Sequence, residues 1–183
     1  KLEKKIIKKI VLPTLSALKK KKKPYNGFLY VGLMIKNGEP FLIEYNIRMG
    51  DPECQVILPR LETDLFKIIM NTVKNKLKKT KIKWKRDKSM TIVLCSKGYP
   101  NKYKNNRPIM NIEKVTLSKN DFIYHAGTKL NNNKLFSNGG RVLNITSVGS
   151  NFRNIRKKII SIIKKLNWKD GFYRKDIGWR VIN

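Results

Sequence analysis

Acidic residues are scarce in this sequence, so their positions are informative. The 183 residues include 12 Asp and Glu, and five of these 12 fall between Glu44 and Asp64. Glu44 and Asn46 stand two positions apart at the end of an apolar run, so on a strand their side chains point to the same face. Two neighbouring oxygen ligands suit a hard divalent cation such as Mg²⁺, which keeps some waters and binds substrate phosphates as well. Such a strand end is also often purely structural, and the pair alone leaves both interpretations open.

The loop after this pair carries further groups that could do chemistry. Arg48 is followed by Gly50, and Asp51 and Glu53 flank Pro52. A guanidinium can hold a carboxylate or phosphate through two parallel hydrogen bonds, and the two carboxylates could hold an ammonium group or orient Arg48. The alternative is a turn with local ion pairs, which contribute little at a surface.

Histidine and cysteine give weaker signals. His125 is the only histidine and could serve as a general base, but we favour a structural histidine at a strand end. Cys54 and Cys95 lie far apart and in no metal-binding spacing, which is typical of a reduced, cytoplasmic protein. No base is close to Cys54 in the sequence, so we expect no nucleophile there.

The net charge of +30 has two interpretations. A large positive potential favours a polyanion such as a nucleic acid as partner. However, 33 of the 42 basic residues are Lys, which is typical of compositional drift in a genome rich in A and T. Proteins that read or stack on bases favour Arg and exposed aromatics, so we favour drift and expect no specific nucleic acid. We also expect no membrane-spanning helix, because the sequence lacks an apolar run of about 18 residues.

Hydrophobic periodicity predicts a mixture of helices and strands. The Asn37-Gly38 turn between two apolar runs predicts a hairpin. Pro13 should end or kink the first helix, and Lys19–Lys23 and Asn46–Arg60 should be loops. The predicted helices are Lys1–Leu12, Leu61–Lys78 and Asn151–Leu166, and the predicted strands are Gly27–Ile35, Pro40–Tyr45, Met90–Ser96, Asp121–His125, Leu135–Phe136 and Arg141–Ser147.

The polar, lysine-rich stretch Lys76–Lys88 is a plausible boundary between two lobes. We therefore expect one domain over residues 1–82 and a second, β-rich domain over residues 83–183.

Six blocks of residues follow one another in a familiar order between about Pro24 and Arg180. They are Gly27–Ile35, Ile43–Gln55, Ser96–Pro100, His125–Lys129, Asn138–Leu143 and Tyr173–Arg180. In this order they resemble the phosphoribosylamine–glycine ligase family, a group of ATP-grasp enzymes of purine biosynthesis. One block could match by chance, but six in order are specific.

The resemblance implies a fold and a reaction. The fold class is α/β (α+β), with the second half of an ATP-grasp domain followed by a small β-rich carboxy-terminal lobe. The family phosphorylates the carboxylate of glycine with ATP, and the amine of 5-phosphoribosylamine then attacks the glycyl phosphate. Glu44 and Asn46 match the family's Mg²⁺ or Mn²⁺ ligands, which agrees with the oxygen pair noted above.

Further site roles are our own hypotheses from this resemblance. Arg48 would hold the glycine carboxylate or the acyl phosphate, and Asp51 and Glu53 would orient Arg48 or contact an amine. Arg141 and Asp176 would help to bind phosphoribosylamine.

The resemblance also implies that the chain is a carboxy-terminal portion. Members have an amino-terminal substrate domain and a first ATP-grasp half, and neither is expected here. We therefore expect no ligase activity from the chain without that missing amino-terminal half. A basic nucleic-acid-binding module or a decayed, non-catalytic remnant stays open as the alternative.

Overall fold

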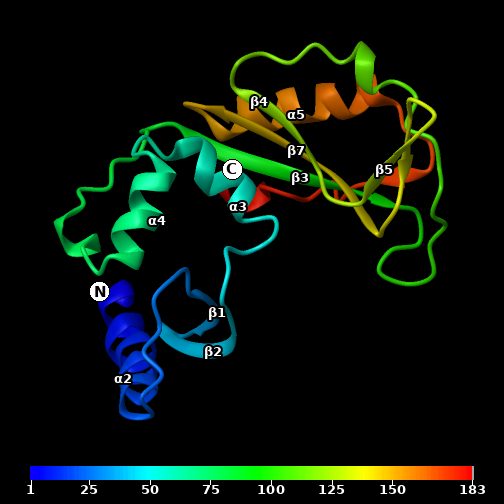
Figure 1. Ribbon diagram of the computed structural model, residues 1–183. Helices are drawn as coiled ribbons and strands as arrows, with labels where there is room; N and C mark the ends of the chain where they lie inside the picture. The colour runs from blue at the N-terminus through cyan, green and yellow to red at the C-terminus, as the bar shows by residue number, and fades with distance from the viewer. Residues whose placement is uncertain (183) are drawn as a thin grey trace. The chain divides into compact units, whose positions relative to one another are not determined.

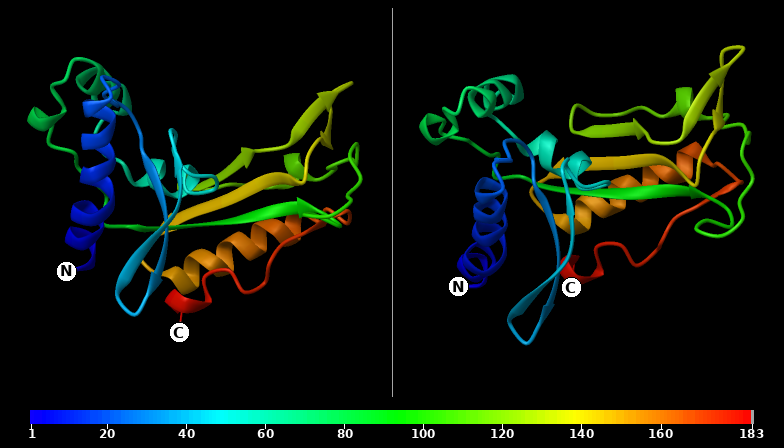
Figure 2. Two further views of the ribbon diagram at one scale, coloured as in Figure 1. Left: turned by 90° about the horizontal axis from the view of Figure 1, so that it is seen from below. Right: turned by 60° about the horizontal axis from the view of Figure 1, so that its bottom comes forward.

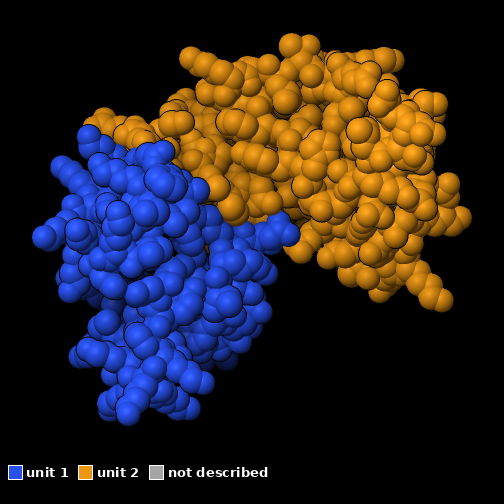
Figure 3. All heavy atoms as spheres, viewed as in Figure 1, with its two compact units in different colours: residues 1–51, 63–83 blue, residues 52–62, 84–183 orange. Residues whose placement is uncertain are grey.

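The computed structural model describes residues 1–182 and divides into two compact units. Unit 1 consists of Lys1–Asp51 and Thr63–Lys83, and unit 2 consists of Pro52–Glu62 and the chain from Trp84 onward (Figure 3). The segment Pro52–Glu62 thus folds with the second unit, although the sequence placed it in the first domain. The domain division at residue 82 stays a prediction.

Unit 1 begins with a helical run that is longer than predicted. It consists of α1 (Leu2–Ile6), a π-helical turn at Ile7–Val11 and α2 (Leu12–Lys20). Of the two predicted outcomes, an end or a kink at Pro13, the end does not occur, because Pro13 lies in the first turn of α2, where a missing N–H is tolerated. The helix therefore reaches Lys20, and the lysine run predicted as a loop starts inside it.

The predicted hairpin of unit 1 is confirmed. Strands β1 (Tyr30–Lys36) and β2 (Glu39–Asn46) pair antiparallel around Asn37 and Gly38. Both turn residues have positive φ, 51° and 73°, which is the conformation that an Asn-Gly turn supplies. The register shifts between Gly32 and Leu33, so the hairpin contains a β-bulge.

The second helical segment of unit 1 is shorter than the predicted Leu61–Lys78. Helix α4 spans Leu65–Val73, because the carboxylate of Asp64 caps its first turn by accepting from the amide of Lys67 at 2.7 Å. Asn75 has a left-handed φ of 55° after the end of α4, and a separate 3₁₀ turn follows at Leu77–Lys79.

Unit 2 is built on a four-stranded antiparallel sheet in the order β4-β7-β3-β8. Helix α5 (Phe152–Leu166) runs along one face of this sheet, as Figures 1 and 2 show. Asn151 caps α5 by accepting from two amides of its first turn, and Ile155, Ile159 and Ile162 are buried in the core. The four strands are β3 (Lys88–Ser96), β4 (Asp121–His125), β7 (Arg141–Gly149) and β8 (Gly171–Phe172).

The remaining elements of unit 2 are short. The hairpin of β5 (Thr128–Asn131) and β6 (Lys134–Ser137) was only partly predicted. The prediction of a loop over Asn46–Arg60 was wrong at its end, where a helical turn and a 3₁₀ turn form close to β3. The short helical elements are α3 (Cys54–Ile57), Leu58–Arg60, Ile112–Lys114 and α6 (Trp179–Ile182).

The predicted α+β class is confirmed by this mixture of helices and antiparallel sheets. Within residues 1–182, none of the helices has the length and hydropathy that crossing a bilayer requires.

Candidate functional site

The structure brings the side chains of Glu44 and Asn46 together at the end of β2. The Nδ2 atom of Asn46 donates a hydrogen bond to Oε1 of Glu44 at 3.1 Å. Tyr45, between them, points to the opposite face, where its hydroxyl lies 2.5 Å from Oγ1 of Thr14 in α2. The helix thus packs on the Tyr45 side of the hairpin, and the two candidate ligands lie on the other side.

The donor set of this pair fits a Mg²⁺-like cation. No group of three or more His, Cys, Asp and Glu residues that could hold a metal occurs among residues 1–182. Glu44 would offer such a cation its carboxylate, and Asn46 would offer its carbonyl Oδ1, since its amide nitrogen donates to Glu44. A small, hard cation often takes only one or two such ligands and completes its shell with water and substrate phosphates.

The candidate residues of the following loop are divided between the two units. The Nη1 atom of Arg48 donates to the backbone carbonyl of Met49 at 2.8 Å, and its side chain is exposed. Asp51 is the last residue of unit 1, whereas Glu53 belongs to unit 2 at the amino end of α3.

In unit 2, Arg141 and Asp176 lie in different surroundings. Arg141 is an exposed residue at the start of β7, and it pairs with Cys95 of β3. Burial raises the pKa of the Cys95 thiol, and the charge of Arg141 partly offsets this rise. Asp176 is exposed and accepts two hydrogen bonds from Arg174, at 2.6 and 3.1 Å, which lower the pKa of its carboxyl group.

Two separate segments of unit 2, one with Ser96 and one with Gly127, meet at the Gly139-Gly140 pair, and strand β8 pairs with the first of them. The amide of Ser96 donates to the carbonyl of Gly140 at 2.8 Å, and its hydroxyl donates to the carbonyl of Gly139 at 2.9 Å. A β-carbon on Gly127 would lie only 3.1 Å from Cα of Gly139. Strand β8, just before the Tyr173–Arg180 block, pairs with β3 at Cys95 and Ser96.

Two sequence models of one family match this chain in order. The model described as "Phosphoribosylglycinamide synthetase, ATP-grasp (A) domain" matches residues 1–54, and the model described as "Phosphoribosylglycinamide synthetase, C domain" matches residues 89–180. The second match covers half of the chain. The chain belongs to the phosphoribosylglycinamide synthetase family. The resemblance noted in the sequence is thereby confirmed, and so is the expected order of an ATP-grasp segment and a carboxy-terminal lobe.

Individual relatives agree with this family. The chain is 43% identical over 176 residues to the phosphoribosylamine–glycine ligase of Agrobacterium fabrum, covering 96% of this chain and 41% of that protein. It is 39% identical to the enzyme of the same name from Fusobacterium nucleatum, covering 97% of this chain and 42% of that protein. The crystal structure of phosphoribosylamine–glycine ligase from Thermotoga maritima superposes with a TM-score of 0.73 at 31% identity, over 89% of this chain and 40% of that one.

The chain therefore spans about two fifths of the length of the curated relatives that it matches. The family membership is a property of the chain itself.

The family's C-domain segment contains a contact that the sequence did not reveal. The ring of Tyr99 covers Gly140 so closely that a β-carbon there would lie 2.1 Å from Cδ2 of Tyr99. Beside this ring lies an apolar cavity of about 360 Å³, lined among others by Val93, Cys95 and Phe172. The only sequence signal was the Gly139-Gly140 pair itself, which is too short to indicate a phosphate loop.

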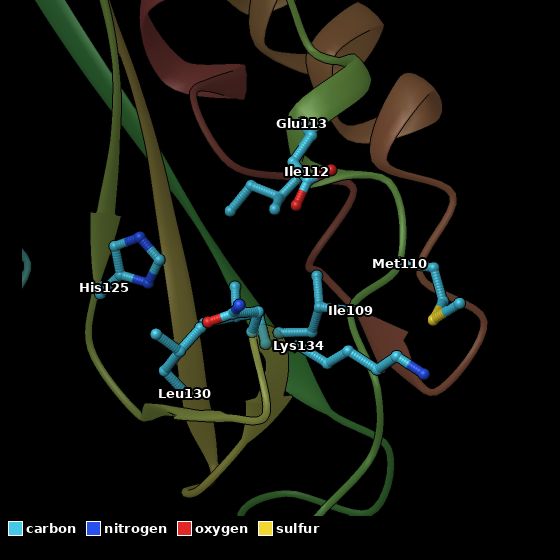
Figure 4. Close-up of a pocket in the computed structure, with 9 residues that line it drawn as sticks. Ile109, Met110, Ile112, Glu113, His125, Leu130 and Lys134 are labelled. Atoms are coloured by element: carbon cyan, nitrogen blue, oxygen red, sulfur yellow. The ribbon is translucent and has the colours of Figure 1, made fainter.

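His125, the only histidine of this family member, lines a second cavity of about 500 Å³ in unit 2. Figure 4 shows its ring on the same side as Leu130, with Ile112 and Glu113 on the other side. Its Nδ1 atom lies 2.9 Å from Oγ1 of Thr128, a local contact three residues away in the sequence. This contact supports the structural interpretation of His125.

Proposed function

We propose that this chain is the carboxy-terminal part of an ATP-dependent ligase that joins glycine to 5-phosphoribosylamine. The γ-phosphoryl group of ATP passes to a carboxylate oxygen of glycine, and ADP leaves. The amine of phosphoribosylamine then attacks the glycyl carbonyl carbon, inorganic phosphate leaves with the electron pair of the broken C–O bond, and the new amide nitrogen loses a proton. Such a reaction depends on positioning and on charge stabilisation around the transferred phosphoryl group.

The Glu44–Asn46 pair carries this proposal. It lies within the segment that matches the family's ATP-grasp domain, and its 3.1 Å hydrogen bond aligns the two side chains on one face. These residues would hold Mg²⁺ or Mn²⁺, which when bound offsets negative charge on the ATP phosphates. The finer choice between the two metals stays open to measurement.

The neighbouring loop supplies groups for the acyl phosphate. Arg48 would leave the carbonyl of Met49 and hold the glycine carboxylate, because a guanidinium forms two parallel hydrogen bonds to such a group. Asp51 and Glu53 would orient Arg48 or contact the attacking amine. Arg141 and Asp176 would help to bind phosphoribosylamine. The ion pair between Arg174 and Asp176 supports a role in which Asp176 orients the guanidinium of Arg174.

Further polypeptide would complete the site. The relatives extend well beyond the matched region, and the hairpin of unit 1 exposes Met34, Phe41 and Ile43 to 58%, 55% and 64%. Clustered exposed apolar side chains of this kind indicate a surface that another element covers. We expect this partner to correspond to the amino-terminal part of the relatives and the whole protein to be cytoplasmic.

A chimera tests the proposal. The chain is joined to the amino-terminal three fifths of the Agrobacterium fabrum relative, and ADP release is measured with glycine and phosphoribosylamine present. We expect substrate-dependent ADP release from the chimera and none from the 183-residue chain alone.

A Glu44→Gln chimera is the matched control, because it keeps the size of the side chain and removes its charge. We expect its rate to fall by at least about 100-fold, in line with the loss of a charge-stabilising group. A folded chimera that releases ADP equally well with Gln at this position contradicts the assigned site. An inactive wild-type chimera that binds ATP and metal contradicts the proposed reaction.

A further inference from the structure

A β-bulge in the hairpin of unit 1 determines which face of the hairpin carries the candidate metal ligands. Leu33 of β1 pairs with Leu42 of β2, but the adjacent Gly32 pairs with Glu44, so Ile43 is an extra residue in the register. Successive side chains of a strand alternate between its two faces. Gly32 therefore lies on the face opposite to Leu33, and Glu44 follows Gly32 to that face.

The register shift that accommodates Ile43 decides whether Glu44 faces the helix. If the side chains of β2 alternated without a bulge, Glu44 would lie on the same face as Leu42. Tyr45 also lies on that face, because Leu42 pairs with Leu33 and Tyr45 pairs with Val31, two residues away on β1. That face is the one on which Tyr45 reaches Thr14 of α2. The bulge thus turns Glu44 and Asn46 away from the helix.

Gly32 leaves the space that the Glu44 side chain occupies. A β-carbon at Gly32 would lie 3.0 Å from Cγ of Glu44 and 3.5 Å from its carbonyl oxygen. Gly32 is buried, and its φ lies outside the left-handed range that favours glycine. Glycine at this position therefore provides space for a neighbouring side chain, and no special backbone conformation requires it.

We propose that Gly32 is a positioning residue for the metal site, an inference that rests on the proposed function. With no side chain at position 32, the Glu44 side chain occupies the space over Gly32 and accepts the hydrogen bond from the Asn46 amide. A methyl group at position 32 pushes the carboxylate away from Asn46 and separates the two ligands. The cross-strand partner of Glu44 is thus part of the site, although it offers no ligand itself.

Paramagnetic broadening by Mn²⁺ tests this role without any enzyme activity. The full chain is labelled with ¹⁵N and titrated with MnCl₂, and the side-chain amide signal of Asn46 and the backbone signal of Glu44 are followed. In the wild type we expect both to broaden before other signals. In Gly32→Ala, half-broadening should need about 10-fold more Mn²⁺, the cost typical of losing a group that orients a ligand.

Met34→Ala is the matched control. Met34 lies on the same strand and the same face, two residues further along, and it pairs with Phe41 away from the site. Its substitution also alters the hairpin surface, but it should leave the Mn²⁺ concentration at half-broadening unchanged. Equal changes in both variants overturn the proposal.

Glu44→Gln separates this proposal from the metal site itself. Broadening that is the same in the wild type and in Glu44→Gln contradicts the site and therefore the proposed function. Broadening that is lost in Glu44→Gln but kept in Gly32→Ala leaves the site in place and overturns only the role of Gly32.

Gly32→Ala could fail to form the hairpin, which cross-strand nuclear Overhauser effects would reveal. In that case a variant that lacks Ile43 provides a second test. Removing the extra residue keeps Gly32 opposite Glu44 and Tyr30 opposite Asn46. The deletion variant should therefore retain selective broadening at Asn46. Its loss in a variant that still forms the hairpin contradicts the proposal.

Discussion

The ring of Tyr99 lies directly over Gly140, and a β-carbon at Gly140 would come within 2.1 Å of Cδ2 and 2.5 Å of Cε2 of that ring. The carbonyl of Gly140 also accepts the amide of Ser96 at 2.8 Å, which limits how far the backbone can move away. This contact fixes the segment after β3 against the start of β7.

Gly140→Ala should therefore destabilise unit 2. Either the ring of Tyr99 or the backbone must shift, and overpacking of this kind costs about 2 kcal/mol in the free energy of unfolding. Urea denaturation followed by tryptophan fluorescence measures the change. Gly149→Ala is the control, because a β-carbon there meets Cγ1 of Ile155 at an ordinary 3.4 Å. Similar losses in the two variants would mean that the Tyr99 contact is not the cause.

Asp121 connects β4, β7 and α5 through a single buried carboxylate. Its side chain is 1% exposed, accepts from the hydroxyl of Ser147 at 2.7 Å and contacts Nζ of Lys158 at 3.0 Å. Asp121→Ala should lower the free energy of unfolding by about 2 kcal/mol, because it leaves the buried hydroxyl of Ser147 without its acceptor. Lys158→Ala should cost less than about 1 kcal/mol, since that ammonium group is half exposed. The prediction fails if the order of the two losses in urea denaturation is reversed.

The same carboxylate should make stability depend on pH. Burial by itself raises the pKa of Asp121, but hydrogen bonds from Ser118, Ser147 and Lys158 outweigh it, so the pKa lies below its usual value of 3.8. The stabilisation is therefore fully present above the unfolded pKa and is lost as the pH falls through the lower, folded pKa. In urea denaturation between pH 5 and pH 2, the wild type should lose more stability than Asp121→Asn. Parallel curves would show that Asp121 does not contribute.

Glu39 should titrate at an unusually low pH. Hydrogen bonds from Lys5 at 2.5 Å and from Lys9 at 2.9 Å lower the pKa of Glu39 from 4.5 to about 2. Because the folded pKa is lowered, this contribution to stability is present above about pH 4.5 and is lost as the pH falls toward 2. A ¹³C titration of the side-chain carboxyl group measures the midpoint. Lys5→Ala should move the midpoint upward, and an unchanged midpoint would exclude Lys5 as the cause.

Arg48 should matter for binding glycine. In the active chimera, Arg48→Ala should raise the KM for glycine by about 10-fold or more, because a charge-assisted hydrogen bond to the carboxylate is lost. Steady-state kinetics with varied glycine checks this, and the KM for ATP serves as the internal control. An unchanged KM for glycine together with an unchanged kcat contradicts the role of Arg48.

Local signals predicted the parts of the fold that depend on neighbouring residues. The Asn37-Gly38 turn supplies the positive φ angles of the hairpin, and Asn151 stands where the first amides of α5 need an acceptor. The first helix was predicted too short because a proline ends a helix only away from its first turn, and the sequence does not state where that turn lies. Helix α4 was predicted too long because Asp64 could be recognised as its cap only once the preceding residues were seen outside the helix.

The candidate site was predictable in part for the same reason. Glu44 and Asn46 are two residues apart, so one strand suffices to bring them to one face. The residue types of the loop that follows indicated Arg48, Asp51 and Glu53, whose roles stay predictions. The role of Gly32 was not predictable, because its pairing with Glu44 depends on a register shift between two strands. The closeness of Tyr99 to Gly140 likewise joins residues 41 positions apart.

The sequence by itself determined the family, the α+β composition and the pairing of Glu44 with Asn46 on one face, because motifs and period-two alternation depend on residues that are close in the chain. Only the tertiary structure decided which face of the hairpin carries Glu44 and which separate blocks meet around Gly139 and Gly140. Those outcomes depend on a register shift between two strands and on the missing β-carbons of Gly32 and Gly140. The register shift and the missing β-carbons act through contacts between residues that are distant in the sequence.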